Sequence, residues 1–478
     1  MNKPTDESQI MKMEQPIFLQ PMPPARPASR LQRLGDAMRR YRRLILGVQW
    51  AVVVFYLALV MIPAFLPLPG TGASVLNNLT LLAQFMFWGI WWPFVIVATL
   101  TMGRVWCGVL CPEGTLTELA SRHGLGRPVP RWLKWGGWPF AAFFITTVYG
   151  QLVSVYEYPK AVLLVLGGST VAAVAVGFIY GKGKRVWCRH LCPVSGVFAL
   201  LARLAPVHFR VDRKKWDAAA STHPVPVDCA PLLDMRRMKS GSQCHMCGRC
   251  SGQRDAVTLA PRLPGAEVAN LKAAEAGAWE ARLLVFGIIG TAVGAFQWSS
   301  SPWFVAIKTR VAEWLIERDS FALLQDNAPW WLLTHYPEAN DVFTWLDGIG
   351  VLTYIGATAL ILGSWITLWL RLAGALLPGD AKQNSRWIAY AFIPLGGLGV
   401  FLGLSALTVT LLKAEGVIMP WLPEVRGALL ALAALWSLWQ GWRMLQRISR
   451  WRKVFALGAL GAAIGGNVFA WMLQFYIW

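Results

Sequence analysis

Charged residues are scarce in this sequence. They make up 15% of its 478 residues, whereas 55% are hydrophobic and the mean hydropathy is +0.44. Soluble globular proteins carry about 25% charged residues on average. The shortage of charge therefore argues against a soluble enzyme and predicts a chain that is largely embedded in a membrane.

Several motifs of cofactor and nucleotide chemistry are absent. None of the six histidines lies in a long apolar run, which argues against a haem held between membrane helices by two histidines. No Cys-x-x-Cys-His occurs, so no covalently attached haem is predicted. The lack of a Walker A run or a complete Gly-x-Gly-x-x-Gly argues against a nucleotide-driven pump. Pairs of acids inside the apolar runs are also missing, which argues against ion transport.

Apolar stretches long enough, or nearly so, to cross a bilayer are abundant. A crossing helix takes about 20 mostly apolar residues. The nine stretches are residues 44–67, 79–100, 138–155, 161–180, 283–303, 349–370, 387–411, 427–442 and 454–478. We therefore predict an all-α integral membrane protein with about nine transmembrane helices. The lipid bilayer is its first predicted interaction partner.

Basic residues gather on one side of these predicted helices. If the N-terminus is cytoplasmic, the inner segments contain 39 of the 45 lysines and arginines. Such a bias marks the cytoplasmic face of a membrane protein. The net charge of +20 is thus explained without nucleic-acid binding. The prediction is a bacterial inner-membrane protein with a cytoplasmic N-terminus and a periplasmic C-terminus.

One nonapeptide occurs twice. Residues 104–112 read RVWCGVLCP and residues 185–193 read RVWCRHLCP, so seven of nine positions are identical. Each copy begins where the second helix of a predicted membrane hairpin ends. Two such units packed side by side would bring four cysteines together at the inner membrane surface.

The other four cysteines follow in the next predicted cytoplasmic segment. Cys229 stands alone, and Cys244, Cys247 and Cys250 lie in the run CHMCGRC. Thiols on the cytoplasmic side stay reduced, so a disulfide framework is not expected. Three thiolates at Cys-x-x-Cys-x-x-Cys spacing favour a [4Fe–4S] cluster over a zinc site, which more often uses two separate Cys-x-x-Cys pairs.

Eight cysteines suffice for two [4Fe–4S] clusters. The preferred partition assigns Cys107, Cys111, Cys188 and Cys192 to one cluster and Cys229, Cys244, Cys247 and Cys250 to the other. In the alternative, Cys111 or Cys192 completes the site of the CHMCGRC run, because Cys-Pro cysteines serve the other cluster in two-cluster ferredoxins. In both cases the cysteines act as ligands, and no catalytic residue is predicted.

Arginines flank the cysteine motifs. Arg104, Arg185, Arg189 and Arg249 lie within a few positions of the predicted ligands. Positive charge near the sulfur atoms raises the reduction potential of a cluster. The competing interpretation of Arg104 and Arg185 is the general cationic bias of cytoplasmic segments.

Four regions follow from these features. They are a basic, proline-rich cytoplasmic tail (1–43), two membrane hairpins with their Cys-x-x-x-Cys-Pro motifs (44–206), a cytoplasmic ferredoxin-like segment (207–282) and a C-terminal transmembrane region (283–478). The last region includes a tryptophan-rich periplasmic loop at residues 304–348.

Paired Cys-x-x-x-Cys-Pro segments after membrane hairpins, followed by a cysteine-rich stretch, resemble the membrane-bound 4Fe–4S polyferredoxins of the NapH/NosR type. The resemblance covers residues 44–260, and the cytochrome oxidase assembly factor CcoG shares related features. The cysteines of the two repeats match the paired motif of that family. Cys244, Cys247 and Cys250 match its ferredoxin-like part, whereas Cys229 is assigned by counting.

The resemblance implies an electron-transfer subunit rather than a stand-alone enzyme. Electrons would pass between the quinol pool, or a cytoplasmic donor, and a respiratory or periplasmic redox partner. The alternative is a CcoG-like copper-handling or metalloenzyme maturation factor, since paired thiolates also bind Cu(I). The chain departs from the family in lacking two full ferredoxin motifs and an extracytoplasmic flavin domain. Its sequence shows no clear quinone pocket.

Overall fold

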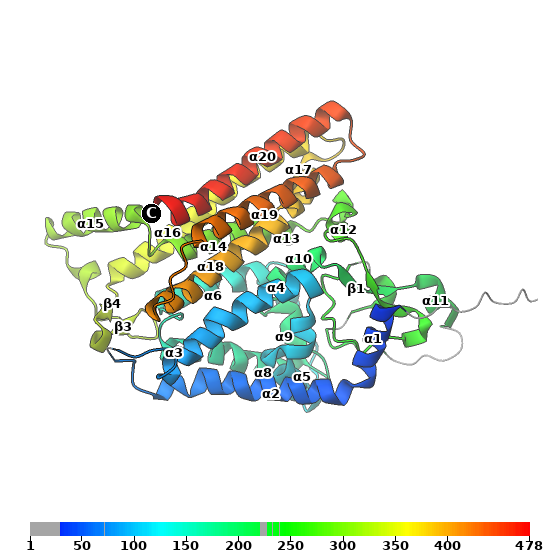
Figure 1. The fold of residues 1–478 in the computed structure, drawn as a ribbon, viewed down its shortest axis with the longest axis horizontal. Coiled ribbons are helices and arrows are strands. Elements are labelled where there is room, and N and C mark those ends of the chain that lie inside the picture. The colour runs from blue at the N-terminus through cyan, green and yellow to red at the C-terminus, as the bar shows by residue number, and fades with distance from the viewer. Residues whose placement is uncertain (1–28, 71, 220–226, 232, 239) are drawn as a thin grey trace, which may run out of the picture.

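The computed structural model describes residues 29–70, 72–219, 227–231, 233–238 and 240–478. Long helices run side by side through most of the molecule, and a small segment with two short strands projects from one end (Figure 1). The first 28 residues of the predicted N-terminal tail lie outside the described part of the chain.

Eight helical segments among the described residues are long and apolar enough to cross a membrane. They are Arg42–Phe65, Leu79–Met102, Pro159–Tyr180, Ala278–Gln297, Trp345–Ala375, Ala381–Ala414, Leu422–Met444 and Arg450–Ile477. Each overlaps a predicted span, because a run of apolar side chains alone makes an internally hydrogen-bonded helix favourable in lipid. The span predicted at 283–303 is shifted, because its helix runs from Ala278 to Gln297. The chain is an all-α, multi-pass membrane protein, as predicted.

The predicted span at residues 138–155 is shorter than the others. It forms α6 (Trp138–Leu152), whose 15 residues rise about 22 Å. At one end, Trp135 packs edge-on against Trp279, with ring centroids 5.0 Å apart. At the other end, the carbonyl of Leu152 accepts hydrogen bonds from Thr334. Helix α6 therefore runs between the same two ends of the bundle as its neighbours, although it is shorter than the length expected of a membrane-crossing helix.

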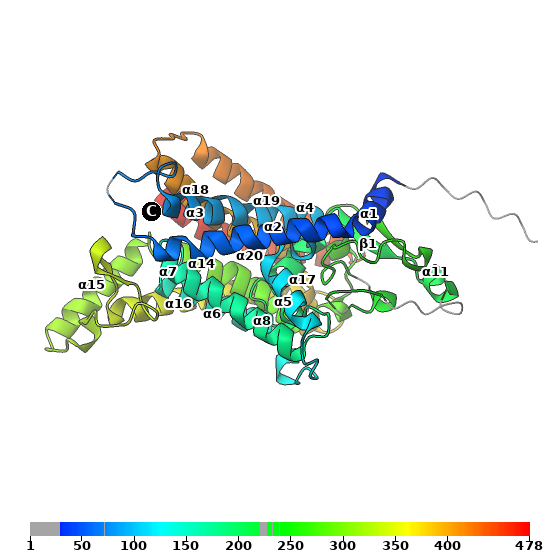
Figure 2. The same cartoon turned by 90° about the horizontal axis from the view of Figure 1, so that it is seen from below.

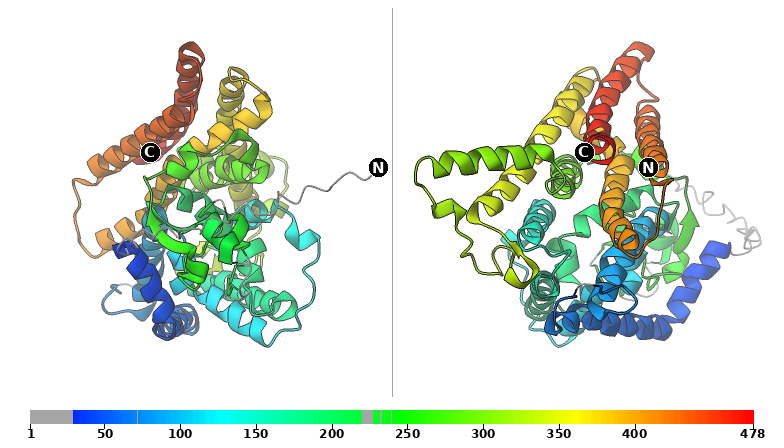
Figure 3. Two further views of the ribbon diagram at one scale, coloured as in Figure 1. Left: turned by 90° about the vertical axis from the view of Figure 1, so that its right-hand side faces the viewer. Right: turned by 60° about the vertical axis from the view of Figure 1, so that its left-hand side comes forward.

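Helices from both halves of the chain share one core. The helix α18 (Ile393–Ala414) packs against α4 (Trp92–Met102) and η11 (Leu283–Thr291), and α16 (Trp345–Ala375) packs against α20 (Arg450–Met472). Seen end-on, the C-terminal helices stand on the side of the molecule opposite α2 (Arg42–Met61) (Figure 3).

Small residues permit the closest helix contacts. Lipid is as apolar as the side chains, so membrane helices associate by close packing rather than by burial from water. A Cβ atom on Gly290 would lie 2.8 Å from the Cα atom of Ala359 on α16, and one on Gly294 would lie 3.0 Å from the Cα atom of Ile355. Larger residues at these two positions would push α16 away.

The projecting segment is built on a two-stranded antiparallel sheet. Strands β1 (Val207–Val211) and β2 (Val257–Pro261) pair with Phe209 opposite Leu259, and α11 (Arg213–Ala218) follows β1. Helix α1 (Arg30–Arg40) lies against this sheet, at the end of α2 from which the segment projects (Figure 2). Residues 30–40, predicted as part of the tail, therefore pack with the cysteine-rich segment.

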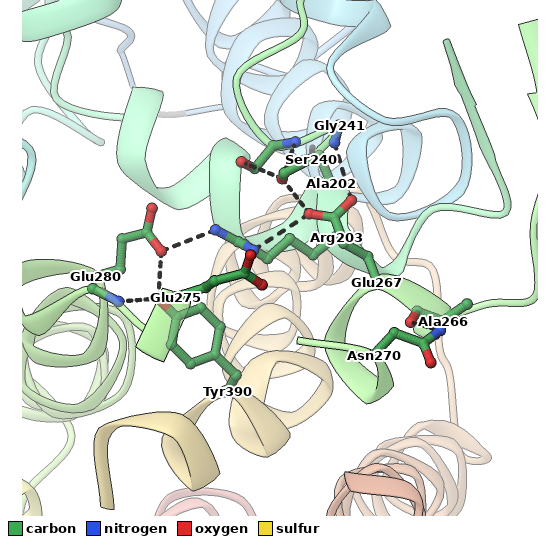
Figure 4. Close-up of polar contacts among 12 residues, drawn as sticks. Ala202, Arg203, Ser240, Gly241, Ala266, Glu267, Asn270, Glu275, Glu280 and Tyr390 are labelled. Atoms are coloured by element: carbon green, nitrogen blue, oxygen red, sulfur yellow. Dashed lines mark hydrogen bonds and ion pairs between the residues drawn. The ribbon is translucent and has the colours of Figure 1, made fainter. Parts of the chain in front are cut away.

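An ionic cluster, in which Arg203 and Glu267 are largely buried and Glu280 is partly exposed, joins the projecting segment to the membrane helices. Arg203 forms ion pairs with Glu267 at 3.3 Å and with Glu280 at 3.0 Å (Figure 4). The hydroxyl of Tyr390 donates to Glu280 and accepts a hydrogen bond from the backbone N–H of Gly277 at 3.0 Å. Because each buried charge has a partner, the cluster can hold three parts of the chain together without leaving a charge exposed to an apolar environment.

The opposite end of the bundle carries the tryptophan-rich loop. It contains α15 (Pro302–Ile316) and a short pair of strands, β3 (His335–Tyr336) and β4 (Asp341–Val342). The ring of Tyr336 stacks on that of Tyr158 with centroids 3.6 Å apart, and the Tyr158 hydroxyl donates to Asp341 at 2.8 Å. These contacts fasten the loop to the second membrane hairpin.

Candidate metal centres

The four cysteines of the two repeats line one cavity. They are Cys107, Cys111, Cys188 and Cys192. Cys107 lies in a turn of π-helix (Trp106–Leu110), and Cys188 lies in α9 (Val186–His190). The repeats therefore meet as the sequence predicts, although their ends differ.

The Cys-Pro pair of the first repeat begins a helix. Cys111 is the N-cap of α5 (Pro112–Arg122), and its sulfur accepts a hydrogen bond from the backbone N–H of Gly114 at 3.3 Å. Proline suits the first helical position, because it has no N–H and its φ angle is already helical. In the second repeat the helix α10 (Ser195–Leu201) starts later, with Val194 as its N-cap. Only the first copy thus places a thiol at a helix N-terminus.

The remaining cysteines line a second, smaller cavity. They are Cys229, Cys244, Cys247 and Cys250. Met246 and Gly248 have φ angles of 52° and 73°, which curl the CHMCGRC loop around the cavity. Two backbone N–H groups point at sulfur: that of Met246 at Cys244 and that of Leu233 at Cys229, each at 3.4 Å. Cys229 is thereby placed with the ferredoxin-like cysteines rather than with the repeats.

The spacing of these thiols bears on the kind of metal group that fits. In the described part of the chain, no three His, Cys, Asp or Glu side chains converge closely enough to hold one metal ion. A cubane cluster stands between its four thiolates, so its ligands are further apart than those of a single ion. Burial raises the pKa of Cys188 and of Cys244 to about 12. Such thiols become thiolates only beside strong positive charge, which iron would supply. The donor set of each cavity, four cysteines, matches that of a [4Fe–4S] cluster.

The two cysteine groups contact one another through the backbone. A Cβ atom on Gly108 would lie 2.0 Å from the carbonyl oxygen of His245 and 2.9 Å from the backbone nitrogen of Cys247. Position 108 therefore cannot carry a side chain. The matching position of the second repeat, Arg189, instead donates to the carbonyl of Pro231 at 2.9 Å. This difference explains why the repeats are not identical there.

A buried carboxylate connects the two groups. Glu118 on α5 accepts from Arg185 at 2.9 Å and pairs with Arg249 at 2.8 Å. Arg185 also donates to the carbonyl of Cys107, while Arg249 follows Cys247 in the CHMCGRC loop. Burial by itself would raise the pKa of Glu118, but hydrogen bonds and charge from Arg249 and Arg185 lower it to about 2. The carboxylate is therefore ionised between the groups.

Arg104 is the residue of the first repeat that matches Arg185 of the second. Its guanidinium donates to the carbonyl of Ser242 at 3.1 Å and to the Ser195 hydroxyl at 2.9 Å, and that hydroxyl donates to the carbonyl of Cys188 at 2.6 Å. Arg104 and Arg185 are 3% and 1% exposed. Such burial distinguishes both from the exposed arginines of a cytoplasmic loop, and they hold the cysteine loops together.

The first cavity extends well beyond its cysteines. Its volume is about 220 Å³, and most of its lining is apolar, including the rings of Trp88, Trp91 and Trp92. Glu113, near Cys111, also lines it and accepts hydrogen bonds from Ser169 at 2.7 Å and from the Trp187 indole at 3.1 Å. A cavity of this kind suits an apolar molecule with a polar head.

Sequence reasoning did not identify the two carboxylates on α5 or the cavity. Glu113 and Glu118 are acids within seven residues of a Cys-Pro pair, in a chain with only 25 acidic residues. That proximity was the available signal. The matching positions of the second repeat are Val194 and Ala199, so the repeat itself gave no indication of them.

The structure is that of a multi-pass membrane protein with two cysteine-lined cavities, and comparisons with known proteins relate it to iron–sulfur proteins. The family model of a 4Fe-4S binding domain matches residues 84–134 and again residues 164–214. Each match contains one Cys-x-x-x-Cys-Pro motif. No solved structure matches the chain.

Three relatives specify the type. The chain is 27% identical over 235 residues to YccM of Escherichia coli, whose name proposes an electron transport role. It is 28% identical over 149 residues to the methylamine utilization ferredoxin-type protein MauN of Paracoccus denitrificans and 24% identical over 178 residues to the ferredoxin-type protein NapH of Haemophilus influenzae. These matches cover 43%, 27% and 31% of this chain and 65%, 52% and 58% of the relatives. The chain thus spans less than two thirds of each relative, and the resemblance to the NapH type is confirmed.

Proposed function

We propose that the chain holds two [4Fe–4S] clusters and passes electrons between the quinol pool and a redox partner protein. A cluster of this kind, when bound, supplies reversible one-electron transfer. The cysteines of the two repeats would hold the first, and Cys229 with the three cysteines of the CHMCGRC run would hold the second. The observation that carries this proposal is the backbone contact at Gly108, which sets two separate cysteine-lined cavities side by side.

The residues around the cysteines would set the reduction potentials of the two clusters. Arg104, Arg185 and Arg249 are buried and positive, and Glu118 is buried and negative. Positive charge and hydrogen bonds near thiolates favour the reduced state of a cluster, whereas the carboxylate opposes it. The balance of these four charges is therefore proposed to keep the reduction potentials of both clusters within a range in which they can exchange electrons.

The large cavity is the proposed site for quinol. Its tryptophan-rich wall suits the apolar tail and ring, and Glu113 and Ser169 offer polar atoms at the cysteine end. Within this cavity, a quinol head would lie close to Cys107, Cys111 and Cys188, which line the same space. Electrons would then need no protein carrier between quinol and the first group of cysteines.

The partner that completes the pathway is proposed to be a membrane-bound or periplasmic protein with its own haem or copper. The repeat cysteines follow the ends of the spans Leu79–Met102 and Pro159–Tyr180, and the other four cysteines line the second cavity. From the distribution of basic residues, we take this end of the bundle to be cytoplasmic. A separate carrier would therefore have to take the electron across the bilayer.

Metal and sulfide analysis after anaerobic purification tests the proposal. Two cubane clusters require roughly eight iron and eight sulfide per chain, together with low-temperature EPR signals on reduction. The variants Cys188→Ser and Cys247→Ser should each lose one cluster, and so about half of the iron, while the chain remains in the membrane. Loss of both clusters from either change would instead mean that ligands are shared between the groups. Copper or zinc without sulfide would support the CcoG-like alternative.

A further inference from the structure

A further pocket, whose lining includes no cysteine, lies where three membrane helices meet. Its walls come from α13 (Ala278–Arg282) and η11, from the end of α16, and from α17 (Ala381–Ala389). Its volume is about 190 Å³. The pocket opens at the end of the bundle to which the basic residues give a cytoplasmic orientation.

Four cations line this pocket, and no acid does. They are Arg282, Arg371, Lys382 and Arg386. Among the described residues, none of the four forms an ion pair with a carboxylate. Arg282 lies over the ring of Trp279, and Arg386 donates to the Gln383 side chain at 3.1 Å. The nearby carboxylate of Asp380 accepts from the backbone N–H groups of Lys382 and Gln383, as the N-cap of α17. Within the described part of the chain, no carboxylate is paired with this cationic rim.

The wall beneath the rim is apolar. Val285, Phe286 and Leu370 line it, and they belong to two helices that are long and apolar enough to cross a membrane. A free inorganic anion would be held by the rim alone and would gain nothing from this wall. A phospholipid would use both, since its phosphate meets the cations while an acyl chain lies along the apolar side chains.

We propose that this pocket binds an anionic phospholipid. Four cations from three helices suit a headgroup with two phosphates, such as that of cardiolipin, and basic pockets between membrane helices on the cytoplasmic side bind such headgroups. The inference is independent of the proposed function, because none of its residues contacts a cysteine loop.

The bound lipid would also secure the cysteine-rich segment. On its other side, α17 holds the chain that leaves that segment: Gln383 donates to the carbonyls of Ala273 and Ala276 at 2.6 and 3.1 Å, and Trp387 donates to the carbonyl of Leu271 at 2.7 Å. A lipid that draws α13, α16 and α17 together therefore stabilises the place where the segment enters the membrane.

Native mass spectrometry of the full, delipidated chain tests the proposal. Cardiolipin should bind more tightly than phosphatidylcholine with the same acyl chains and should raise the thermal midpoint of unfolding. The double variant Arg371→Gln with Arg386→Gln should weaken cardiolipin binding about tenfold, since each cation near the headgroup contributes to attraction. The control Arg127→Gln with Arg131→Gln removes the same charge from the exposed loop before α6 and should leave binding unchanged.

Three results would overturn the proposal. Equal binding of cardiolipin and phosphatidylcholine by the wild-type chain would remove the need for a charged headgroup. Equal loss in both double variants would mean that net charge, not this pocket, attracts the lipid. If inorganic phosphate at the same phosphorus concentration raised the thermal midpoint of unfolding as much as cardiolipin does, the pocket would be a phosphate site. If the double variant does not fold, Lys382→Gln, at an exposed position, provides the same comparison with a smaller loss.

Discussion

The guanidinium of Arg185 and the carboxylate of Glu118 lie 2.9 Å apart, both almost fully buried, between the two groups of cysteines. The same carboxylate pairs with Arg249 from the CHMCGRC loop. One residue of the first repeat thus holds a cation from each group, and changing it should alter both centres at once.

We predict that Glu118→Gln raises the reduction potentials of both clusters together. Removing the negative charge leaves Arg185 and Arg249 less compensated, which favours the added electron. The expected shift is about 60 mV upward, equivalent to a tenfold change in a one-electron equilibrium. Redox titration followed by EPR measures it. Glu317→Gln, at an exposed position on the opposite end of the bundle, is the control, and a shift of only one cluster would contradict the bridging role.

The same variant should change the acid stability of the chain. The pKa of Glu118 is lowered from 4.5 to about 2, so its contribution to stability is complete above about pH 4.5 and is lost as the pH falls toward 2. The free energy of unfolding of the wild-type chain should therefore exceed that of Glu118→Gln by about 3 kcal/mol near neutral pH. This difference should vanish in acid. Unfolding of both chains across this pH range, followed by circular dichroism, measures the difference. A difference independent of pH would exclude the ionised carboxylate as its cause.

Gly108→Ala should separate the two cysteine loops. The added methyl group would overlap the carbonyl of His245, and backbone on both sides must move, at a cost of about 1–3 kcal/mol or more. We expect a lower thermal midpoint and reduced iron content. Gly168→Ala is the matched control, because a Cβ atom there would meet nothing within 4 Å. Retention of full iron and stability in Gly108→Ala would contradict the close contact.

Filling the large cavity should block exchange with quinol while leaving iron in place. Thr147 on α6 lines the cavity, so Thr147→Trp would occupy the proposed site. Ile145, two residues earlier on the same helix, is 60% exposed, and Ile145→Trp is the control. Anaerobic reduction of the clusters by a short-chain quinol, followed by absorbance, should be slowed at least about tenfold in the first variant only. Equal rates in both would place the quinol site elsewhere.

Local patterns in the sequence predicted the membrane helices well. The predicted spans 349–370 and 427–442 lie within the helices Trp345–Ala375 and Leu422–Met444. Hydropathy succeeds here because in lipid each backbone group must be bonded within its own helix, so the decision rests on neighbouring residues. The repeat was equally visible, since its seven identical positions lie within nine consecutive residues.

The sequence alone determined an all-α membrane chain with two related cysteine motifs and a separate cysteine-rich run, because each of these features depends on residues that are adjacent in the sequence. Only the tertiary structure decided that Glu118 meets Arg185 and Arg249, that Gly108 touches His245, and that Arg282, Arg371 and Arg386 face one pocket. The residues of each set are tens to more than a hundred positions apart or lie on different helices. Their meeting depends on how the helices pack, and packing in a bilayer is governed by the fit of small residues such as Gly290 against Ala359, which no local pattern reveals.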